Sequence, residues 1–353
     1  MDRALWCGLM ALTWAVALPA AAQSRLFSSD APLQIVISAP FPALVSSAKT
    51  STKPYPASLS VVDGAGAPKT LPVELRPRGH TRRTAGYCSF PPLYLKFDKA
   101  AAHGTVFQGQ HKLKLVTYCR PVSDYEQRIV LEYLAYRLYN LMTPMSFRVR
   151  AADVTYQNSA GGGEPVKRFG FLVENIDDVA DRNQRDHLAA KSHEISAAQL
   201  DARASARAAL FEFMIGNLDW DFLAAPPGAD CCHNALLVAA RKATPATASG
   251  VAPVPYDFDY SGFVDSPYAG PPPSLPVTKL TERLYRGYCV SSGDIPAVVE
   301  EYRDHRAQVM ALINGEPRLN DGFRNKTARF IDGFYAVLDD PQRVQKSLVG
   351  HCR

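Results

Sequence analysis

The chain has 353 residues, a hydrophobic content of 47% and a formal net charge of +5 at pH 7. This hydrophobic content is ordinary for a globular protein with a sizeable core. The positive excess is modest, and with a pI of about 8.7 it gives no reason to expect a nucleic-acid partner. By length alone, the chain could form one large domain or two.

Residues 1–22 have the pattern of a signal peptide. Arg3 supplies a positive start, residues 5–18 form an apolar run, and small residues at 19–22 precede a cleavage point before Gln23. A membrane anchor would need about 20 apolar residues, and this run is shorter. No later segment is long and apolar enough to span a bilayer. We therefore expect a periplasmic or secreted protein with no stable membrane span.

Six cysteines remain after the predicted cleavage: Cys88, Cys119, Cys231, Cys232, Cys289 and Cys352. An even number of cysteines in an oxidising compartment predicts disulfides, in pairings that sequence cannot rank. Zinc binding by Cys231, Cys232 and His233 is the alternative, but adjacent ligands lack the usual spacing, so we expect no zinc. A bond between neighbours would strain the peptide that joins them. We therefore expect Cys231 and Cys232 to bond outward to two different segments.

Short apolar runs separated by turns predict strands at residues 33–37, 57–62, 71–75 and 93–97. Between the last two lies a basic loop, RPRGHTRR, at residues 76–83. A glycine-containing turn that is rich in Arg and Thr donors can cover phosphates with its backbone N–H groups. A solvated basic hairpin is the plainer alternative, because a single glycine is not a fingerprint.

Two lysines share one face of the next predicted strand, HKLKLVT at residues 111–117. The alternation places Lys112 and Lys114 on the face opposite Leu113 and Leu115. Protein kinases hold the phosphates of their nucleotide with a strand lysine. Simple exposure to solvent is the alternative, and the residues alone do not decide between them.

An amphipathic helix is predicted at residues 124–142, where apolar side chains recur at helical spacing. Glu126 and Glu132 on this helix are candidates to pair with a strand lysine, although carboxylates of this kind are more often exposed. Residues 147–156 and 166–174 then form a predicted hairpin.

The chain becomes polar and helical near residue 178. This change is the predicted boundary between a β-rich N-lobe at residues 23–178 and an α-rich C-lobe at residues 179–353. Helices are predicted in the second part at residues 196–217, 294–314 and 321–338.

Three polar clusters follow apolar runs in this second part: GNLDWDF at 216–222, CCHNALLV at 231–238 and VPYDFDYSG at 254–262. They contain the oxygen ligands that hold Mg²⁺ against a phosphate, namely Asp219, Asp221, Asn234, Asp257 and Asp259. A general-base Asp, then an Asn ligand, then an Asp-Phe-x ligand after a strand is the order of kinase active sites.

The linear order of these motifs resembles the CotH family of spore-coat-type atypical protein kinases. The motifs are RPRGHTRR, LYLKF, HKLKLVT, GFLVENID, GNLDWDF, HNALL and VPYDFDYSG. GNLDWDF followed by HN is also similar to the signature of HipA-like kinases. The resemblance implies an α+β protein with a two-lobed, atypical protein-kinase-like fold, and it implies that ATP and Mg²⁺ or Mn²⁺ bind between the lobes.

The resemblance assigns roles to three residues of the polar clusters. Asp219 matches the catalytic Asp, which accepts the proton of a substrate hydroxyl. Asn234 and Asp257 match the metal ligands. Asp221 and Asp259 are second-rank candidates, because Asp221 leaves the assignment of the base ambiguous.

The resemblance also assigns phosphate and nucleotide contacts in the first part. Arg78, Gly79 and Thr81 match the loop over the phosphates, although His80 stands where the family usually has Asn. Lys112 or Lys114 would contact phosphate, with Lys96 as a third candidate, and Glu174 would touch the base or ribose.

These roles predict a phosphotransferase that moves a phosphoryl group, or a nucleotidyl group in a flipped donor pose, to a protein or cell-envelope acceptor. The predicted export argues against turnover, because ATP is scarce outside the cytoplasm. The alternative is a catalytically inactive binding or envelope-assembly protein held together by disulfides. A hydrolase ranks lower, because no Ser-His or His-rich metal pattern accompanies the carboxylates.

Overall fold

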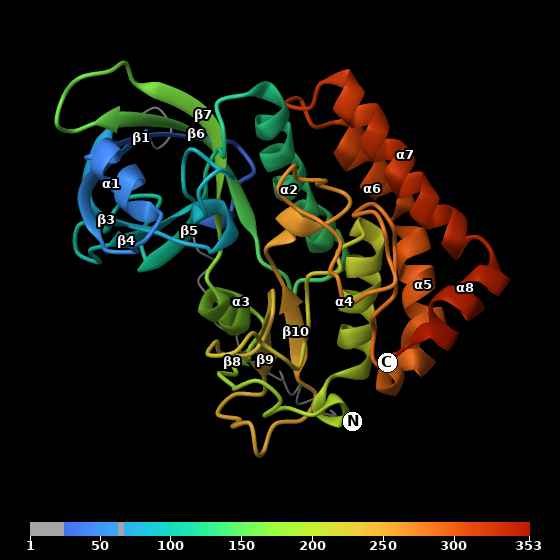
Figure 1. Cartoon of the computed structure of the whole chain (residues 1–353). Coiled ribbons are helices and arrows are strands. Elements are labelled where there is room, and N and C mark those ends of the chain that lie inside the picture. Colours follow the sequence, from blue (N-terminus) through green and yellow to red (C-terminus); the bar gives the residue numbers. More distant parts are fainter. Residues whose placement is uncertain (1–24, 63–66) are drawn as a thin grey trace, which may run out of the picture.

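Seven strands from the first half of the chain close into a barrel (Figure 1). The computed structural model describes residues 25–62 and 67–353, so the predicted signal peptide at residues 1–22 lies outside the described residues. The strands are β1 (Leu33–Ala39), β2 (Tyr55–Val61), β3 (Lys69–Pro77), β4 (Leu93–Phe97), β5 (Lys112–Val116), β6 (Val149–Asn158) and β7 (Val166–Val173). Their order around the barrel is β1-β2-β3-β4-β5-β7-β6.

The barrel closes where β1 runs parallel to β6, and all other neighbouring strands are antiparallel. Alternate side chains fill its interior, as expected for a barrel of this size. On β5 the predicted alternation is confirmed, because Leu113 and Leu115 are buried while Lys112 is exposed and Lys114 is only half-buried. The barrel therefore has a packed core, with the two lysines on the outer face of β5.

Helices and a small sheet make up most of the rest of the chain (Figure 1). The α-helices are α1 (Phe41–Ala48), α2 (Ser123–Met142), α3 (Ile176–Arg182), α4 (Ala202–Ile215), α5 (Ile295–Asp304), α6 (Arg306–Asn314), α7 (Asp321–Leu338) and α8 (Pro341–Ser347). The small sheet has the order β10-β9-β8, with β8 (Asp186–His187), β9 (Ala235–Ala239) and β10 (Ala252–Pro255). Short 3-10 turns are η1 (Arg25–Phe27), η2 (Thr81–Arg83), η3 (Ala197–Gln199), η4 (Phe258–Tyr260), η5 (Cys289–Asp294) and η6 (Val349–His351).

The expected two-lobed, protein-kinase-like fold is wrong, although the protein is mixed α+β. The described residues form a closed seven-stranded barrel, a separate three-stranded sheet and eight α-helices. The difference arises from the β1–β6 pairing, which runs from Leu33 opposite Ala152 to Ala39 opposite Asn158. Such a pairing joins segments far apart in the sequence, and local periodicity carries no information about it.

Helix α2 packs on the outer face of β6 and β7, in a core that is separate from the interior of the barrel. Leu131, Leu134 and Leu138 are buried in the same cluster as Phe171 of β7 and Phe211 of α4. Leucines and aromatic residues at helical spacing make α2 buried on several sides rather than on one. A carboxylate on this helix therefore lies inside the protein unless it is near an end.

Three disulfides join the six cysteines, which confirms the prediction of disulfide bonds. Cys88 bonds to Cys119, and Cys289 bonds to Cys352. The expectation that Cys231 and Cys232 bond outward is wrong, because they bond to each other. None of the helices in the described ranges combines the length and the apolar composition needed to cross a bilayer.

Candidate active site

The β9–β10 hairpin brings two of the sequence motifs to one place. Asn234 immediately precedes β9, and Asp257 follows β10 by two residues. Pro255 lies opposite Ala235, and the N–H of Tyr256 donates to the carbonyl of Asn234 at 2.9 Å. In an antiparallel pair the start of one strand meets the end of the other. Asn234 and Asp257 therefore lie at the same end of the hairpin.

Both residues have left-handed backbone conformations, with φ of 52° at Asn234 and 66° at Asp257. Asn and Asp adopt this region more readily than other non-glycine residues. Non-glycine residues in this region cluster at functional sites. The N–H of Asp257 donates to the hydroxyl of Tyr136 on α2 at 2.9 Å. Within the described residues its carboxylate accepts no hydrogen bond, so both oxygens are available to a ligand.

Asp219 is joined to Asn234 and His233 by hydrogen bonds. It follows α4, which ends at Gly216 in a left-handed conformation that suits glycine. The side-chain amide of Asn234 donates to the backbone carbonyl of Asp219 at 2.6 Å and to its Oδ2 at 3.0 Å. His233 Nε2 lies 2.6 Å from Asp219 Oδ1, and this hydrogen bond raises the pKa of His233. Asp219 is about one-third exposed and can meet a substrate from solvent.

The neighbouring Asp221 has a structural role. Its Oδ1 accepts hydrogen bonds from the N–H groups of Leu223 and Ala224 and from the hydroxyl of Tyr288. Its Oδ2 pairs with Arg353 at 2.8 Å. Burial acts to raise the pKa of Asp221, but these donors lower it below its usual value. Asp219 is therefore the better candidate for a general base.

The barrel supplies two cations whose charges interact with that of Asp257. Burial and repulsion by Arg78 lower the pKa of Lys114 from its ordinary 10.5 to about 7, while Asp257 acts in the opposite direction. Burial also disfavours the charge on Arg78, but Asp257 and then Tyr94 outweigh it and raise the pKa of Arg78. Lys114 Nζ lies 3.7 Å from the ring centroid of Tyr256, next to Asp257 in sequence. Arg78, Lys114 and Asp257 therefore share one electrostatic environment.

The other two candidate lysines are exposed. Lys112 Nζ lies 4.0 Å from the ring centroid of Tyr94, the same ring over which Arg78 lies. Lys96 lies on β4, opposite Glu74 of β3 and Lys112 of β5. Lys114 is the only half-buried one of the three strand lysines and the one that lies over Tyr256, next to Asp257.

The basic loop turns at Gly79, whose φ of 76° favours glycine. The N–H of Arg78 donates to the carbonyl of Pro92, which ties the loop to the start of β4. Thr81 lies beside Tyr260, three residues after Asp257. The loop that carries Arg78, Gly79 and Thr81 is therefore next to the late acidic motif, as a phosphate-covering loop would need to be.

A buried group of charges lies beneath these residues. Glu132 of α2 is 1% exposed, and its Oε2 has no hydrogen-bond partner among the described residues. Burial, followed by the charges of Asp259 and Asp257, raises the pKa of Glu132 well above its usual range. Burial and Asp257 raise the pKa of Asp259 to about 7, and the hydroxyl of Tyr268 donates to its Oδ2. Asp259 is thus mostly buried, close enough to Asp257 for the two charges to interact.

Sequence reasoning did not identify Arg82 or the role of His233. Arg82 is buried, donates to the carbonyl of Thr117 at 2.6 Å, and partly offsets the carboxylates of Glu132 and Asp259. The basic loop has four arginines, and the sequence does not indicate which of them turns inward. His233 was considered only as a zinc ligand, although its position next to Asn234 could have suggested a contact with Asp219.

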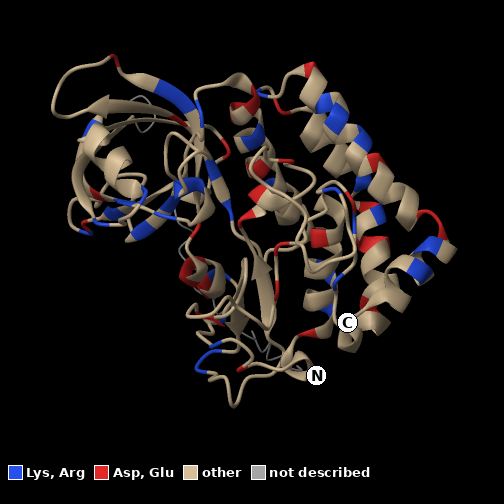
Figure 2. Ribbon diagram, viewed as in Figure 1, with Lys and Arg blue, Asp and Glu red and all other residues tan. Residues whose placement is uncertain are grey.

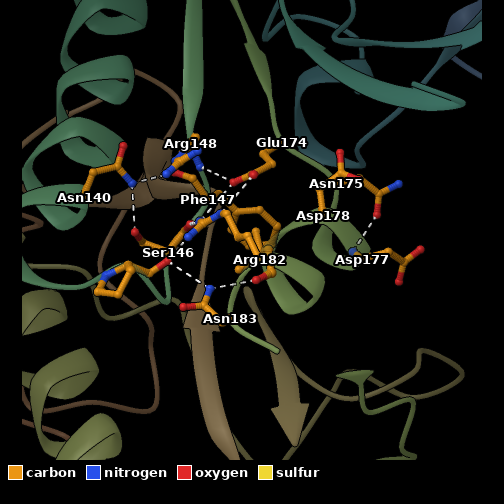
Figure 3. Close-up of polar contacts among 12 residues, drawn as sticks. Asn140, Ser146, Phe147, Arg148, Glu174, Asn175, Asp177, Asp178, Arg182 and Asn183 are labelled. Atoms are coloured by element: carbon orange, nitrogen blue, oxygen red, sulfur yellow. Dashed lines mark hydrogen bonds and ion pairs between the residues drawn. The ribbon is translucent and has the colours of Figure 1, made fainter. Parts of the chain in front are cut away.

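Glu174, the predicted base or ribose contact, is used within the protein (Figure 3). It is 3% exposed, and its Oε2 accepts from the backbone N–H of Arg148 at 2.9 Å. Arg182 donates to both of its carboxylate oxygens at 3.1 Å and also to the carbonyls of Pro144 and Ser146. A nucleotide could engage the carboxylate of Glu174 only by displacing these partners.

The oxygen atoms that could bind a metal at this site suit an ion that also binds phosphates. Because the amide nitrogen of Asn234 faces Asp219, its carbonyl oxygen is left for a ligand, as is the carboxylate of Asp257. Among the described residues, no three His, Cys, Asp or Glu side chains gather as a metal cage. Mg²⁺ usually binds one or two carboxylates together with substrate phosphates and water rather than a full protein cage. Asn234 and Asp257 fit that mode.

No protein-family model matches the chain, and a search of curated proteins also finds no match. The resemblance to the CotH family therefore depends on the order of the motifs in the sequence alone.

Proposed function

We propose that this protein transfers a phosphoryl group from ATP, bound with Mg²⁺ or Mn²⁺, to a hydroxyl of a protein or cell-envelope acceptor. The observation that carries the proposal is the meeting of Asp219, Asn234 and Asp257 at one end of the β9–β10 hairpin, where the charge of Asp257 interacts with those of Arg78 and Lys114. The motif order of CotH-like kinases supports the same reaction. The acceptor's location follows from the predicted signal peptide.

Each residue has a defined task in this reaction. Arg78 and Lys114 would bind the phosphates and offset their negative charge, which is the main form of catalysis in phosphoryl transfer. Asn234 and Asp257 would hold the metal, which neutralises charge on the phosphate oxygens when bound. Gly79 and Thr81 would place backbone N–H groups over the same phosphates.

Asp219 would position the acceptor and take its proton. The acceptor oxygen forms a bond to the γ-phosphorus, the bond from that phosphorus to the β,γ-bridging oxygen breaks, and ADP leaves. The hydroxyl proton passes to the Asp219 carboxylate. The hydrogen bonds from His233 and Asn234 fix the orientation of this carboxylate before the acceptor arrives.

One observation favours the alternative of an inactive binding or envelope-assembly protein. Both carboxylate oxygens of Asp219 already have partners, and the nearest of these contacts is 2.6 Å. In the inactive alternative, the network around Asp219 only stabilises the hairpin, and Cys231–Cys232 beside it is a further brace. This alternative predicts the same fold without nucleotide binding.

Thermal-shift and calorimetric titrations with ATP separate the two functions. We expect the wild-type protein to bind ATP only with Mg²⁺ or Mn²⁺, and we expect Asp257→Ala to lose this binding. Asp321→Asn is the matched control, because the Asp321 side chain is 97% exposed on α7 and far from the hairpin in the chain. Absence of nucleotide binding with any divalent metal would exclude the phosphotransferase and leave the inactive alternative.

A further inference from the structure

A pocket near the C-terminus is lined by basic side chains and contains no acidic one. Its volume is about 420 Å³, and its lining includes Arg283, Arg343, Lys346 and His351. The pocket lies among α7, α8 and the segment that precedes the Cys289–Cys352 disulfide. Lys and Arg residues occur on both α7 and α8 (Figure 2). None of these residues takes part in the proposed phosphoryl transfer.

Arg283 is the main feature of this pocket, because its half-buried guanidinium group has no acidic partner among the described residues. Burial lowers the pKa of Arg283 to about 10, and no neighbouring carboxylate acts in the opposite direction. Its Nε and Nη2 donate to the carbonyl of Met214, and Nη2 also donates to the carbonyl of Phe330. The guanidinium carbon also lies 3.8 Å from the ring centroid of Phe330, a contact that stabilises the cation. Neither the carbonyls nor the ring carries a negative charge to neutralise it. A partly buried charge without a counter-charge favours an anion.

One nitrogen of this guanidinium remains for a ligand. Arg283 Nη1 has no hydrogen bond within the described residues, and it lies beside Gly333 of α7, which also lines the pocket. A Cβ at Gly333 would lie 3.5 Å from Nη1 and would cover it. Glycine inside a helix costs roughly 0.5–1 kcal/mol relative to alanine. The missing side chain thus leaves the half-buried cation open to the pocket.

The rim of the pocket adds further donors. Arg343, Lys346 and His351 are exposed, and within the described residues the Lys346 and His351 side chains have no hydrogen-bond or ion-pair partner. The acidic residues nearest in sequence are already used. Asp340 accepts from the N–H groups that start α8, and Asp339 pairs with Arg306. The positive charge of the pocket is therefore not offset locally.

We propose that this pocket binds the phosphate group of an anionic ligand, with Arg283 at its floor and Arg343, Lys346 and His351 at its rim. Guanidinium groups match phosphate oxygens in geometry and charge. The volume exceeds that of a single phosphate, so the ligand carries a second group or a second phosphate. The site is separate from Asp219 and Asp257 and does not depend on the proposed phosphotransferase activity.

Calorimetric titration with pyrophosphate, without divalent metal, tests the site. The background is Arg78→Gln/Lys114→Gln, which removes the two cations that we assign to phosphate binding at the candidate active site. We expect one saturable site, at least about tenfold weaker in Arg343→Gln/Lys346→Gln, because each lost charge-assisted hydrogen bond is worth about 1.5–3 kcal/mol. Lys49→Gln, which removes an exposed lysine on the barrel side, is the matched control and should bind as the background does.

Gly333→Ala provides a second test that keeps every charge. We expect this variant to fold at least as stably as the parent and to bind pyrophosphate several-fold more weakly, because the new methyl group covers Arg283 Nη1. Sedimentation with phosphatidylglycerol vesicles, compared with phosphatidylcholine vesicles, distinguishes a lipid headgroup from a soluble phosphate. Absence of binding to both pyrophosphate and phosphatidylglycerol, or equal binding by all variants, would overturn the proposal.

Discussion

Lys114 gives the candidate active site a pH dependence that can be measured. Burial and the charge of Arg78 lower its pKa to about 7, so at pH 9 the free protein carries this lysine largely uncharged. Phosphate binding requires the charged form and restores the pKa toward its ordinary 10.5. Binding then takes up a proton whenever the pH lies between these two values.

The size of the effect follows from this linkage. Below pH 7 the lysine is already charged, so its titration should no longer change the affinity for ATP with Mg²⁺. Between about pH 8 and pH 9.5 the dissociation constant should rise by nearly tenfold for each pH unit. The second ionisation of a phosphate lies near pH 6 and is complete in this range, so it adds no dependence.

Isothermal titration calorimetry with ATP and Mg²⁺ between pH 7.5 and 9.5 measures the affinity. Repeating it in buffers that differ in ionisation enthalpy gives the number of protons taken up on binding. Lys114→Arg should bind with an affinity that is constant over this range, because arginine stays charged. Lys96→Met, which removes an exposed lysine of β4, is the control and should keep the wild-type slope. An affinity of the wild-type protein that is the same at pH 7.5 and pH 9.5 would show that Lys114 does not contact the phosphates.

Three further predictions concern the stability and the disulfides of the protein. Asp221→Asn should lower the free energy of unfolding by about 1–3 kcal/mol in urea titrations, because it loses the ion pair to Arg353. Since Glu132 has a raised pKa, the folded state holds more protons than the unfolded state, and wild-type stability should fall as pH rises above the unfolded pKa. Glu132→Gln should reduce this fall in stability. If the stability of the variant falls with pH as steeply as that of the wild-type protein, a group other than Glu132 causes the fall. Peptide mass mapping of the alkylated, non-reduced protein should find no free thiol among the six cysteines that form the three disulfides. Alkylation of any of these cysteines would contradict the disulfides.

Local patterns predicted those parts of the structure that depend on neighbours in sequence. The alternation of residues 111–117 correctly assigned the two faces of β5, because the period of a strand fixes them. The helix expected at 321–338 agrees with α7 (Asp321–Leu338). Asn234 and Asp257 flank two apolar runs joined by a polar turn, so their meeting follows from hairpin pairing.

Long-range pairing and the inward direction of charged groups could not be predicted in this way. The closure of the barrel by β1 and β6 depends on the packing of the whole sheet. The structural role of Asp221 depends on Arg353 at the far end of the chain. The helix expected at residues 294–314 is divided at His305, where ψ is −2° and the helical backbone ends.

The central claim is that Asp219 accepts a proton in a phosphoryl transfer for which Asp257 holds the metal. The most direct measurement is release or transfer of the labelled γ-phosphate of ATP, made together with ATP binding, in the wild-type protein, Asp219→Asn and Asp257→Ala. We expect the wild-type protein to turn over ATP. Asp219→Asn should bind ATP with little change but lose turnover by a hundredfold or more, roughly the upper part of the range for general-base catalysis. Asp257→Ala should lose both ATP binding and turnover. A wild-type protein that binds no ATP with Mg²⁺ or Mn²⁺, or an Asp219→Asn variant that turns over at the wild-type rate, would contradict the central claim.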